Sequence, residues 1–236
     1  MNQMIKPQPY CKNCRLAPPT LSDDKVQELE AIIKPGHLLH KGDFVFRQGD
    51  PFHSVFLVRS GSIKTFTTNE QGLEKITGFY YATEIFGFSG MGEGAYPVSA
   101  QALESTLCSE IPFSQLEELS SQIPGLSHQI MLMMSRKIRE DQQMKLLLSR
   151  LNSDSRIAAF LLNISAHFRE RGFSATRFRL SMSRNEIGDY LGLAVETVSR
   201  SFTRLQKHGL IRVDGRETEI VDFTELCALA GGEVEL

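Results

Sequence analysis

Three polar side chains in one short segment have the types and spacing needed to recognise DNA bases. Glu196, Ser199 and Arg200 lie in the segment 181–210. An arginine guanidinium can donate two hydrogen bonds to guanine, a glutamate can accept one from cytosine N4, and a serine hydroxyl can reach a base edge. A solvated helix face more usually mixes Glu and Lys. The segment therefore predicts a helix whose N-terminal end enters the major groove.

Other polar residues extend this candidate DNA-binding surface. They continue along the same helix face or stand at the start of the preceding helix, and Lys207 among them is expected to contact phosphate, which adds affinity without sequence information. The complete predicted set is Ser183, Arg184, Glu196, Thr197, Ser199, Arg200, Thr203, Arg204 and Lys207.

Two helices must position these side chains. Ser183 can cap the first helix, and Glu186, three residues later, can return a hydrogen bond to the cap's own N–H. Ile187 and Leu191 lie one turn apart and form the apolar stripe of that helix, which ends near Gly192. The sequence thus predicts the first helix of a helix-turn-helix.

The second helix presents apolar residues on the face opposite to its polar ones. Val198, Phe202 and Leu205 follow an i, i+4, i+7 pattern, and Gly209 is a suitable residue to end the helix. The alternative to a helix-turn-helix is a plain helical hairpin, but the polar face favours DNA binding.

A short hairpin is predicted directly after the second helix. Residues 210–213 and 219–221 have strand character, and Asp214 and Gly215 form the turn. A hairpin in this place is the wing of a winged helix.

The first half of the chain has a different pattern, with short apolar runs separated by glycines from Leu38 to about Pro112. Many short strands at such spacing predict a β-sandwich or jelly roll. The expected strands are 44–46, 55–58, 63–66 and 76–80, and the expected turn residues are Gly42, Gly49, Gly61, Gly72, Gly78 and Gly87.

The longest helical stretch runs from Ser127 to Leu151 and contains a heptad pattern, which predicts a parallel two-stranded dimer contact. A helix that packs only on its own domain is the alternative. We favour the dimer because a twofold axis suits a DNA-binding module. The predicted seam is Met131, Met134, Ile138, Asp141, Lys145 and Leu148. Another amphipathic helix is expected within 152–175.

The whole chain has the size and composition of a globular protein with two domains. It has 236 residues, of which 41% are hydrophobic and 23% charged. No apolar run approaches the roughly 18 residues of a membrane span, and the N-terminus does not resemble a signal peptide. We therefore expect a cytoplasmic protein with no membrane partner. Its four cysteines do not indicate a disulfide framework.

The net charge of −2 is unevenly distributed. Residues 1–124 hold ten basic and fourteen acidic residues, whereas residues 176–212 hold seven basic and three acidic residues. Phosphate binding needs local positive charge, so one basic module in a near-neutral chain favours a sequence-specific DNA-binding protein.

Several stretches make the chain resemble the superfamily of the cyclic-AMP receptor protein and the fumarate-nitrate reductase regulator (CRP/FNR), and its second branch above all. They are RLSMSRNEIGDYLGLAVETVSRSFTRLQKHGL, EKITGF, DQQMKLLLSRL, SAQALE and EIPF. The resemblance implies a homodimeric transcription activator that binds a palindrome similar to TTGAT-N4-ATCAA, with Glu196, Ser199 and Arg200 as base contacts. It also implies RNA polymerase as a partner.

The expected fold class is α+β, with an N-terminal β jelly roll of the cyclic-nucleotide-binding type, a long dimerisation helix and a C-terminal winged helix-turn-helix. The expected divisions are a flexible arm at 1–20, a sensor domain at 21–126, the dimerisation helix at 127–151 and the DNA-binding domain at 152–236.

The sensor is where the sequence departs from the family's pattern. Oxygen-sensing members hold a [4Fe–4S] cluster with four cysteine thiolates. Cys11 and Cys14 match two of them, but Thr20 stands at the third position, and Ser109 stands at the fourth with Cys108 one residue early. In a strand, this shift turns the side chain to the other face. We predict a protein without a cluster.

Two alternatives remain for these cysteines. One is a cluster completed by Cys108 and an oxygen ligand, and the other is a redox dithiol formed by Cys11 and Cys14.

Cyclic AMP is not expected as a ligand. The stretch 84–100, which corresponds to the nucleotide-binding region of the receptor-protein branch, has no arginine to pair with a phosphate. The glycines at 90, 92 and 94 lack the strand–turn–helix context of a dinucleotide site, and His37 and His40 do not form a cupin-type metal site. A jelly-roll enzyme or small-molecule-binding protein is the competing class, but no catalytic arrangement of residues supports it.

Overall fold

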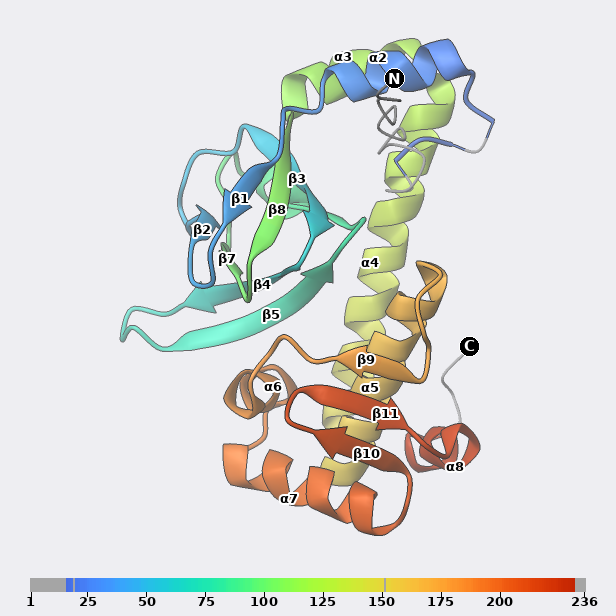
Figure 1. Ribbon diagram of the computed structural model, residues 1–236. Helices are drawn as coiled ribbons and strands as arrows, with labels where there is room; N and C mark the ends of the chain where they lie inside the picture. Colours follow the sequence, from blue (N-terminus) through green and yellow to red (C-terminus); the bar gives the residue numbers. More distant parts are fainter. Residues whose placement is uncertain (1–15, 19, 151, 232–236) are drawn as a thin grey trace, which may run out of the picture. The chain divides into compact units, whose positions relative to one another are not determined.

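The computed structural model describes residues 16–18, 20–150 and 152–231. The chain divides into two compact units (Figure 1). Of these described residues, the first unit comprises those up to 74 and 78–138, and the second comprises 75–77 and those from 139 onwards. The boundary lies inside the long helix, after Ile138, whereas the sequence analysis treats residues 127–151 as a division of their own between the two domains.

The first unit is built on two four-stranded sheets, which confirms the predicted jelly roll. One sheet has the order β1 (His37–Leu39), β8 (Thr106–Pro112), β3 (Ser54–Ser60) and β6 (Ile85–Phe86). The other has the order β2 (Phe44–Phe46), β7 (Ser99–Ala102), β4 (Ser62–Thr68) and β5 (Glu74–Tyr81). A single 3-10 turn, η1 (Phe88–Gly90), follows β6.

Glycines make the tight turns of the roll where the sequence predicts them, with one exception. Gly61 connects β3 to β4 with φ of +81°, and a Cβ there would lie 2.6 Å from the carbonyl oxygen of Ser105, so no other residue fits. Gly78 is the exception, because it lies inside β5. A Cβ at Gly78 would be 3.3 Å from Thr65 Oγ1, so this glycine permits close packing between strands.

Aromatic rings fill the core between the two sheets. Phe46 stacks on Tyr96 with ring centroids 3.8 Å apart, and Phe56 and Phe86 continue the cluster at 5.7 Å from each other. The hydroxyl of Tyr96 donates to the carbonyl oxygen of Ser54 at 2.6 Å, which satisfies the one polar atom of that ring.

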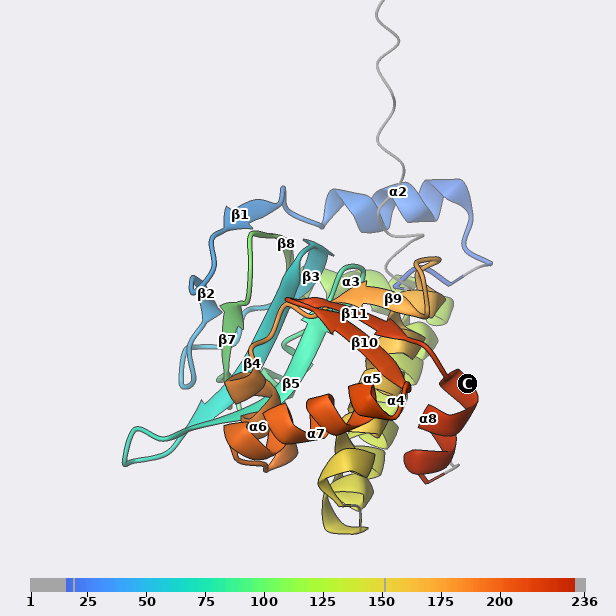
Figure 2. The same cartoon turned by 60° about the horizontal axis from the view of Figure 1, so that its bottom comes forward.

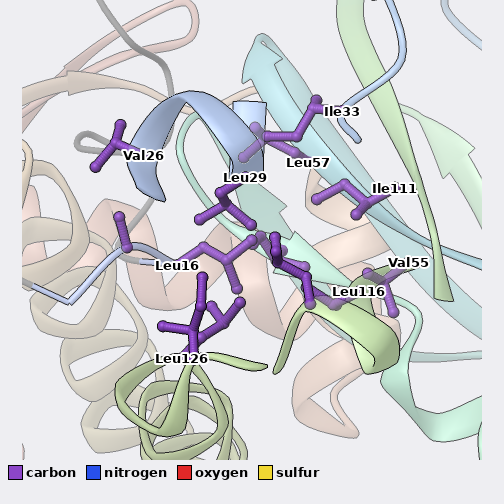
Figure 3. Packing of buried hydrophobic residues seen from close by; sticks show 13 residues of the cluster. Leu16, Val26, Leu29, Ile33, Val55, Leu57, Ile111, Leu116 and Leu126 are labelled. Atoms are coloured by element: carbon purple, nitrogen blue, oxygen red, sulfur yellow. The ribbon is translucent and has the colours of Figure 1, made fainter. Parts of the chain in front are cut away.

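A second apolar core lies between the β3–β8 sheet and three helices, α2 (Asp23–Ala31), α3 (Phe113–Gln122) and the start of α4 (Pro124–Arg150). Leu29, Leu116 and Leu126 are fully buried there (Figure 3). Leu16 also lies in this core with 0% of its surface exposed. The end of the predicted flexible arm is therefore a packed part of the first unit.

The second unit contains the predicted helix-turn-helix and wing (Figure 2). After the end of α4 it comprises α5 (Ser153–Glu170), β9 (Arg177–Arg179), α6 (Arg184–Leu191), α7 (Val195–Lys207), β10 (Ile211–Asp214), β11 (Glu217–Ile220) and α8 (Phe223–Leu229). The wing has three strands in the order β10–β11–β9, because β9 pairs with β11. The sequence did not predict β9 or α8.

Within the described part of the chain, no helix combines the length and apolar character that a membrane span requires.

Candidate DNA-binding surface

A complete capping box begins α6. Ser183 Oγ accepts a hydrogen bond from the Glu186 backbone N–H at 3.2 Å, and the Glu186 carboxylate accepts one from the Ser183 backbone N–H at 2.8 Å. This geometry confirms the predicted start of the helix and satisfies two donors that a helix leaves unpaired. Ser183 is thereby engaged in the structure of the unit, although its side chain stays exposed.

A close approach of backbones fixes the turn between the two helices. The Leu193 backbone N–H donates to the Gly188 carbonyl oxygen at 2.8 Å, and Gly192 adopts the left-handed conformation with φ of +65°. A Cβ at Gly188 would lie 2.5 Å from the Leu193 carbonyl oxygen. Two glycines therefore set the angle at which α7 leaves α6.

The apolar face of α7 is buried as the sequence predicts. Val198, Phe202 and Leu205 are each at most 2% exposed. The five exposed members of the predicted set on this helix lie elsewhere on its surface: Glu196, Ser199, Arg200, Thr203 and Lys207. The helix thus presents a carboxylate, two hydroxyls and two cations to solvent. Its buried apolar face fixes its rotation about its own axis.

The side chains of this surface also make hydrogen bonds along their own helix. Ser199 Oγ donates to the Val195 carbonyl oxygen at 3.0 Å, and Thr203 Oγ1 donates to the Ser199 carbonyl oxygen at 3.0 Å. Arg200 reaches the half-buried Thr197 hydroxyl at 3.4 Å. These contacts restrict the side chains while leaving Arg200 exposed.

Two of the predicted DNA-binding arginines are held by the protein itself. The Arg184 guanidinium lies 3.2 Å from the ring centre of Phe202, and burial lowers the pKa of Arg184 to about 10. It remains charged at neutral pH, and the stacking anchors α6 to α7. Arg204 forms an ion pair with Asp154 of α5 at 2.5 Å. Sequence alone could not show either engagement, since both partners are distant along the chain.

The sheet of the wing carries an ion-pair cluster, which the predicted set did not include. The Glu219 carboxylate lies between Arg177 at 3.2 Å and Arg212 at 2.7 Å. These two arginines are about 70% and 69% exposed, and they hold the pKa of Glu219 below its ordinary value. Two exposed guanidinium groups thus share one carboxylate on the sheet of the wing.

The predicted dimer seam lies on a face of α4 that is exposed in this chain. Met131 and Ile138 are 59% and 57% exposed, whereas Leu126 of the same helix is fully buried in the core of the first unit. Asp141 and Lys145 are also exposed, and Met134 and Leu148 are half-buried. One face of α4 thus packs on its own unit and another presents large apolar side chains.

The residues that would hold an iron–sulfur cluster do not fit a set of four thiolates. Cys108 of β8 pairs with Val58 of β3 and lies in the aromatic core between the sheets, where burial raises the pKa of its thiol to about 12. A metal ligand must be a thiolate, and this burial disfavours that form. Ser109 occupies the next position, opposite Leu57, and is 0% exposed. Its hydroxyl makes no hydrogen bond within the described residues.

The register of β8 decides which of these side chains faces the N-terminal segment. Leu57, the partner of Ser109, belongs to the core that contains Leu16, and Cys108 points to the opposite side of the sheet. Thr20 is exposed, and Cys11 and Cys14 lie outside the described residues. Among the residues that the structure describes, no group of three His, Cys, Asp or Glu side chains is placed to hold a metal ion.

A jelly roll joined to a winged helix-turn-helix defines a transcription regulator with a sensor-type domain. Residues 37–122 match the family described as cyclic nucleotide-binding domain, and residues 155–229 match the Crp-like helix-turn-helix domain. The chain belongs to the CRP/FNR family of transcription regulators. The comparisons therefore confirm the predicted family and fold.

Individual relatives are similar to this chain along most of its length. The transcriptional activator protein anr of Pseudomonas aeruginosa is 59% identical over 97% of this chain and 96% of its own. The fumarate and nitrate reduction regulatory protein of Salmonella typhimurium is 44% identical over 94% of this chain and 90% of its own. The structure of FixK2 from Bradyrhizobium japonicum matches with a TM-score of 0.74 at 26% identity, over 82% of this chain and 96% of that one.

Proposed function

We propose that this DNA-binding regulator is an activator that acts as a homodimer on a palindrome similar to TTGAT-N4-ATCAA, with half-sites about one helical turn apart. The observation that supports this most is the exposed polar face at the start of α7, above a fully buried apolar face. Glu196, Ser199 and Arg200 contact bases in this proposal, and Lys207 contacts phosphate.

The dimer in this proposal forms along the exposed face of α4. Large exposed apolar side chains such as Met131 and Ile138 favour a contact with a second copy of the chain, because exposed hydrophobic surfaces of this kind mark association sites. RNA polymerase is the proposed partner at promoters, in line with the activators among its relatives, and the cytoplasm is where the chain would meet its DNA.

Binding to the palindrome can be tested with two substitutions on α7. Arg200→Ala should cost ~1–3 kcal/mol of binding free energy and relax the preference for guanine, because a fork of two hydrogen bonds is lost. Lys207→Ala should weaken binding to all duplexes by a similar factor and reduce the slope of log affinity against log salt by about 1. The measurement is a salt titration by fluorescence anisotropy on specific and random duplexes.

The two variants serve as controls for each other. Equal losses on both duplexes for Arg200→Ala would show that Arg200 does not contact a base. Failure of the unmodified protein to prefer the palindrome over the random duplex would contradict the proposed target.

We also infer that this regulator operates without a four-thiolate [4Fe–4S] cluster. Support comes from Cys108, which is buried as a neutral thiol, and from Ser109 and Thr20, which stand where the family has thiolates. The aromatic rings of Phe46 and Tyr96 pack the roll interior, which argues against cyclic AMP as its ligand.

Purification without oxygen provides the test. The protein should contain far less than four irons per chain and should bind the palindrome before and after exposure to air. Cys108→Ala, the matched control, should have the same iron content and visible spectrum. A charge-transfer band with about four irons per chain that disappears in air together with DNA binding would refute the inference.

A further inference from the structure

The first turn of α5 holds the recognition helix through a bidentate ion pair. Arg204 of α7 donates from Nε to Asp154 Oδ2 at 2.7 Å and from Nη2 to Asp154 Oδ1 at 2.5 Å. The same Nη2 donates to Ser201 Oγ at 3.0 Å. Two parallel hydrogen bonds fix both distance and orientation, which a single contact does not.

The same turn of α5 also binds the ends of two other helices. Arg156 donates to the carbonyl oxygen of Leu148 at 2.6 Å and to that of Leu191 at 3.2 Å. Leu148 lies in the last turn of α4, and Leu191 is the last residue of α6. Carbonyls at helix C-termini lack partners within the helix and carry partial negative charge, so a guanidinium is a suitable donor.

These contacts connect three helices to one point of the fold. Asp154 and Arg156 lie two residues apart on α5, and between them they bind α7, α6 and the end of α4. Asn152 fixes the start of α5, because its side chain accepts a hydrogen bond from the Ser155 backbone N–H at 3.0 Å.

We propose that Asp154 is a positioning residue for DNA recognition, and that Arg204 acts through it and does not contact DNA. The proposal rests on the proposed function of α7 and revises the role that the sequence predicts for Arg204. Through the Asp154–Arg204 pair, the recognition helix keeps a fixed position relative to α5 and to the other helix ends held there. Base contacts by Arg200, one turn earlier, depend on that position.

The location of Asp154 explains why its carboxylate is required. The N-terminus of α5 carries partial positive charge, which attracts an anion and repels a guanidinium. Without the negative charge at position 154, Arg204 would face that positive end with only neutral partners. Loss of the charge should therefore displace Arg204 and loosen α7.

The test compares Asp154→Asn, Asp154→Glu and Arg204→Gln in the full chain. Asp154→Asn should lower the affinity for the palindrome about tenfold and reduce discrimination against a substituted guanine, with an unchanged salt slope. Arg204→Gln should have the same effect, and the double variant should be no weaker than either single variant. Asp154→Glu, which keeps the carboxylate, should recover most of the loss. Near-ultraviolet circular dichroism of each variant reports on folding.

The alternative role of Arg204 as a phosphate contact gives different results. In that case Asp154→Asn would release the arginine, tighten binding and steepen the salt slope, whereas Arg204→Gln would reduce the slope by about 1. Either result, or additive losses in the double variant, would overturn the proposal. The unmodified protein distinguishes this failure from failure of the proposed function, because its preference for the palindrome does not depend on the role of Arg204.

Discussion

At the scale of single residues, sequence predicts which side chains have suitable chemistry, but not which of them the fold has already engaged. Glu196, Ser199 and Arg200 are exposed as their spacing on a helix predicts. Arg184 and Arg204 have equally suitable side chains, yet one stacks on Phe202 and the other pairs with a carboxylate fifty residues away along the chain. Contacts over such separations depend on packing, for which a helical period carries no information.

The position of Cys108 leads to a prediction about its reactivity. Burial raises the pKa of this thiol to about 12, so at pH 8 almost none of it is the nucleophilic thiolate. Iodoacetamide should leave Cys108 unmodified in the native protein while it labels the half-buried Cys227. In denaturant, both should react. Peptide mass spectrometry after alkylation measures the extent at each site.

The same shift has a consequence for stability at alkaline pH. In the unfolded chain the thiol ionises near pH 9, whereas in the folded protein it stays neutral, so stability should fall as pH rises from about 9 towards 12. Cys108→Ala should remove that part of the pH dependence. Native labelling of Cys108 at the rate of an exposed thiol would contradict its position in the core.

At the scale of elements, local sequence signals predicted the helix-turn-helix well and very short strands poorly. The capping box at Ser183 and the left-handed glycine at Gly192 act within a few residues, so sequence shows them. Strand β9 has three residues and exists because β11 pairs with it, and β11 lies some forty residues further on. A strand this short has no periodicity of its own to detect.

Gly188 provides a test of the turn between α6 and α7. Alanine in place of a helical glycine usually stabilises a protein by roughly 0.5–1 kcal/mol. Gly188→Ala should instead destabilise the second unit by ~1–3 kcal/mol, because the new Cβ would lie 2.5 Å from the Leu193 carbonyl oxygen and 3.3 Å from Val198 Cγ2. The melting temperature of the protein and its affinity for the palindrome should both decrease.

A second helical glycine serves as the matched control. Gly125 lies in the first turn of α4, and a Cβ there would meet Pro18 Cγ at an ordinary 3.5 Å. Gly125→Ala should leave the melting temperature equal or higher. If both variants behaved alike, the close approach at Gly188 would not be what sets the turn.

At the scale of the whole molecule, sequence predicted the two kinds of unit but not how the segment before α2 packs. The jelly roll and the winged helix-turn-helix follow from strand spacing and helix periodicity, which are repeated many times along the chain. Leu16 belongs to the predicted flexible arm, yet it is fully buried among Leu29, Leu116 and Leu126 (Figure 3). A single leucine in a proline-rich stretch carries no pattern, so only the assembled core shows where it lies.

The predicted dimer seam of α4 contains two charges, Asp141 and Lys145, in an otherwise apolar series, and both are exposed. In a parallel dimer, Asp141 would face Asp141 of the partner, and this repulsion opposes association. The family resemblance implies that oxygen-sensing members use an aspartate here to keep the cluster-free form monomeric, with isoleucine one turn later. Lys145 replaces that isoleucine. Its ammonium can reach the Asp141 carboxylate four residues earlier on the same helix, or the same carboxylate of the partner.

We expect Lys145 to let this chain dimerise without a cluster. An exposed i, i+4 pair stabilises by only ~0.2–0.5 kcal/mol, so the compensation requires the partly desolvated seam of the dimer to strengthen it. Lys145→Met should shift the metal-free protein towards monomer in sedimentation equilibrium. Asp141→Ala in that background should restore the dimer, because the uncompensated carboxylates are then gone. If Lys145 instead extends to the rim of the seam and leaves its charge in water, Lys145→Met will leave the dimer unchanged or tighter, and the compensation is then wrong.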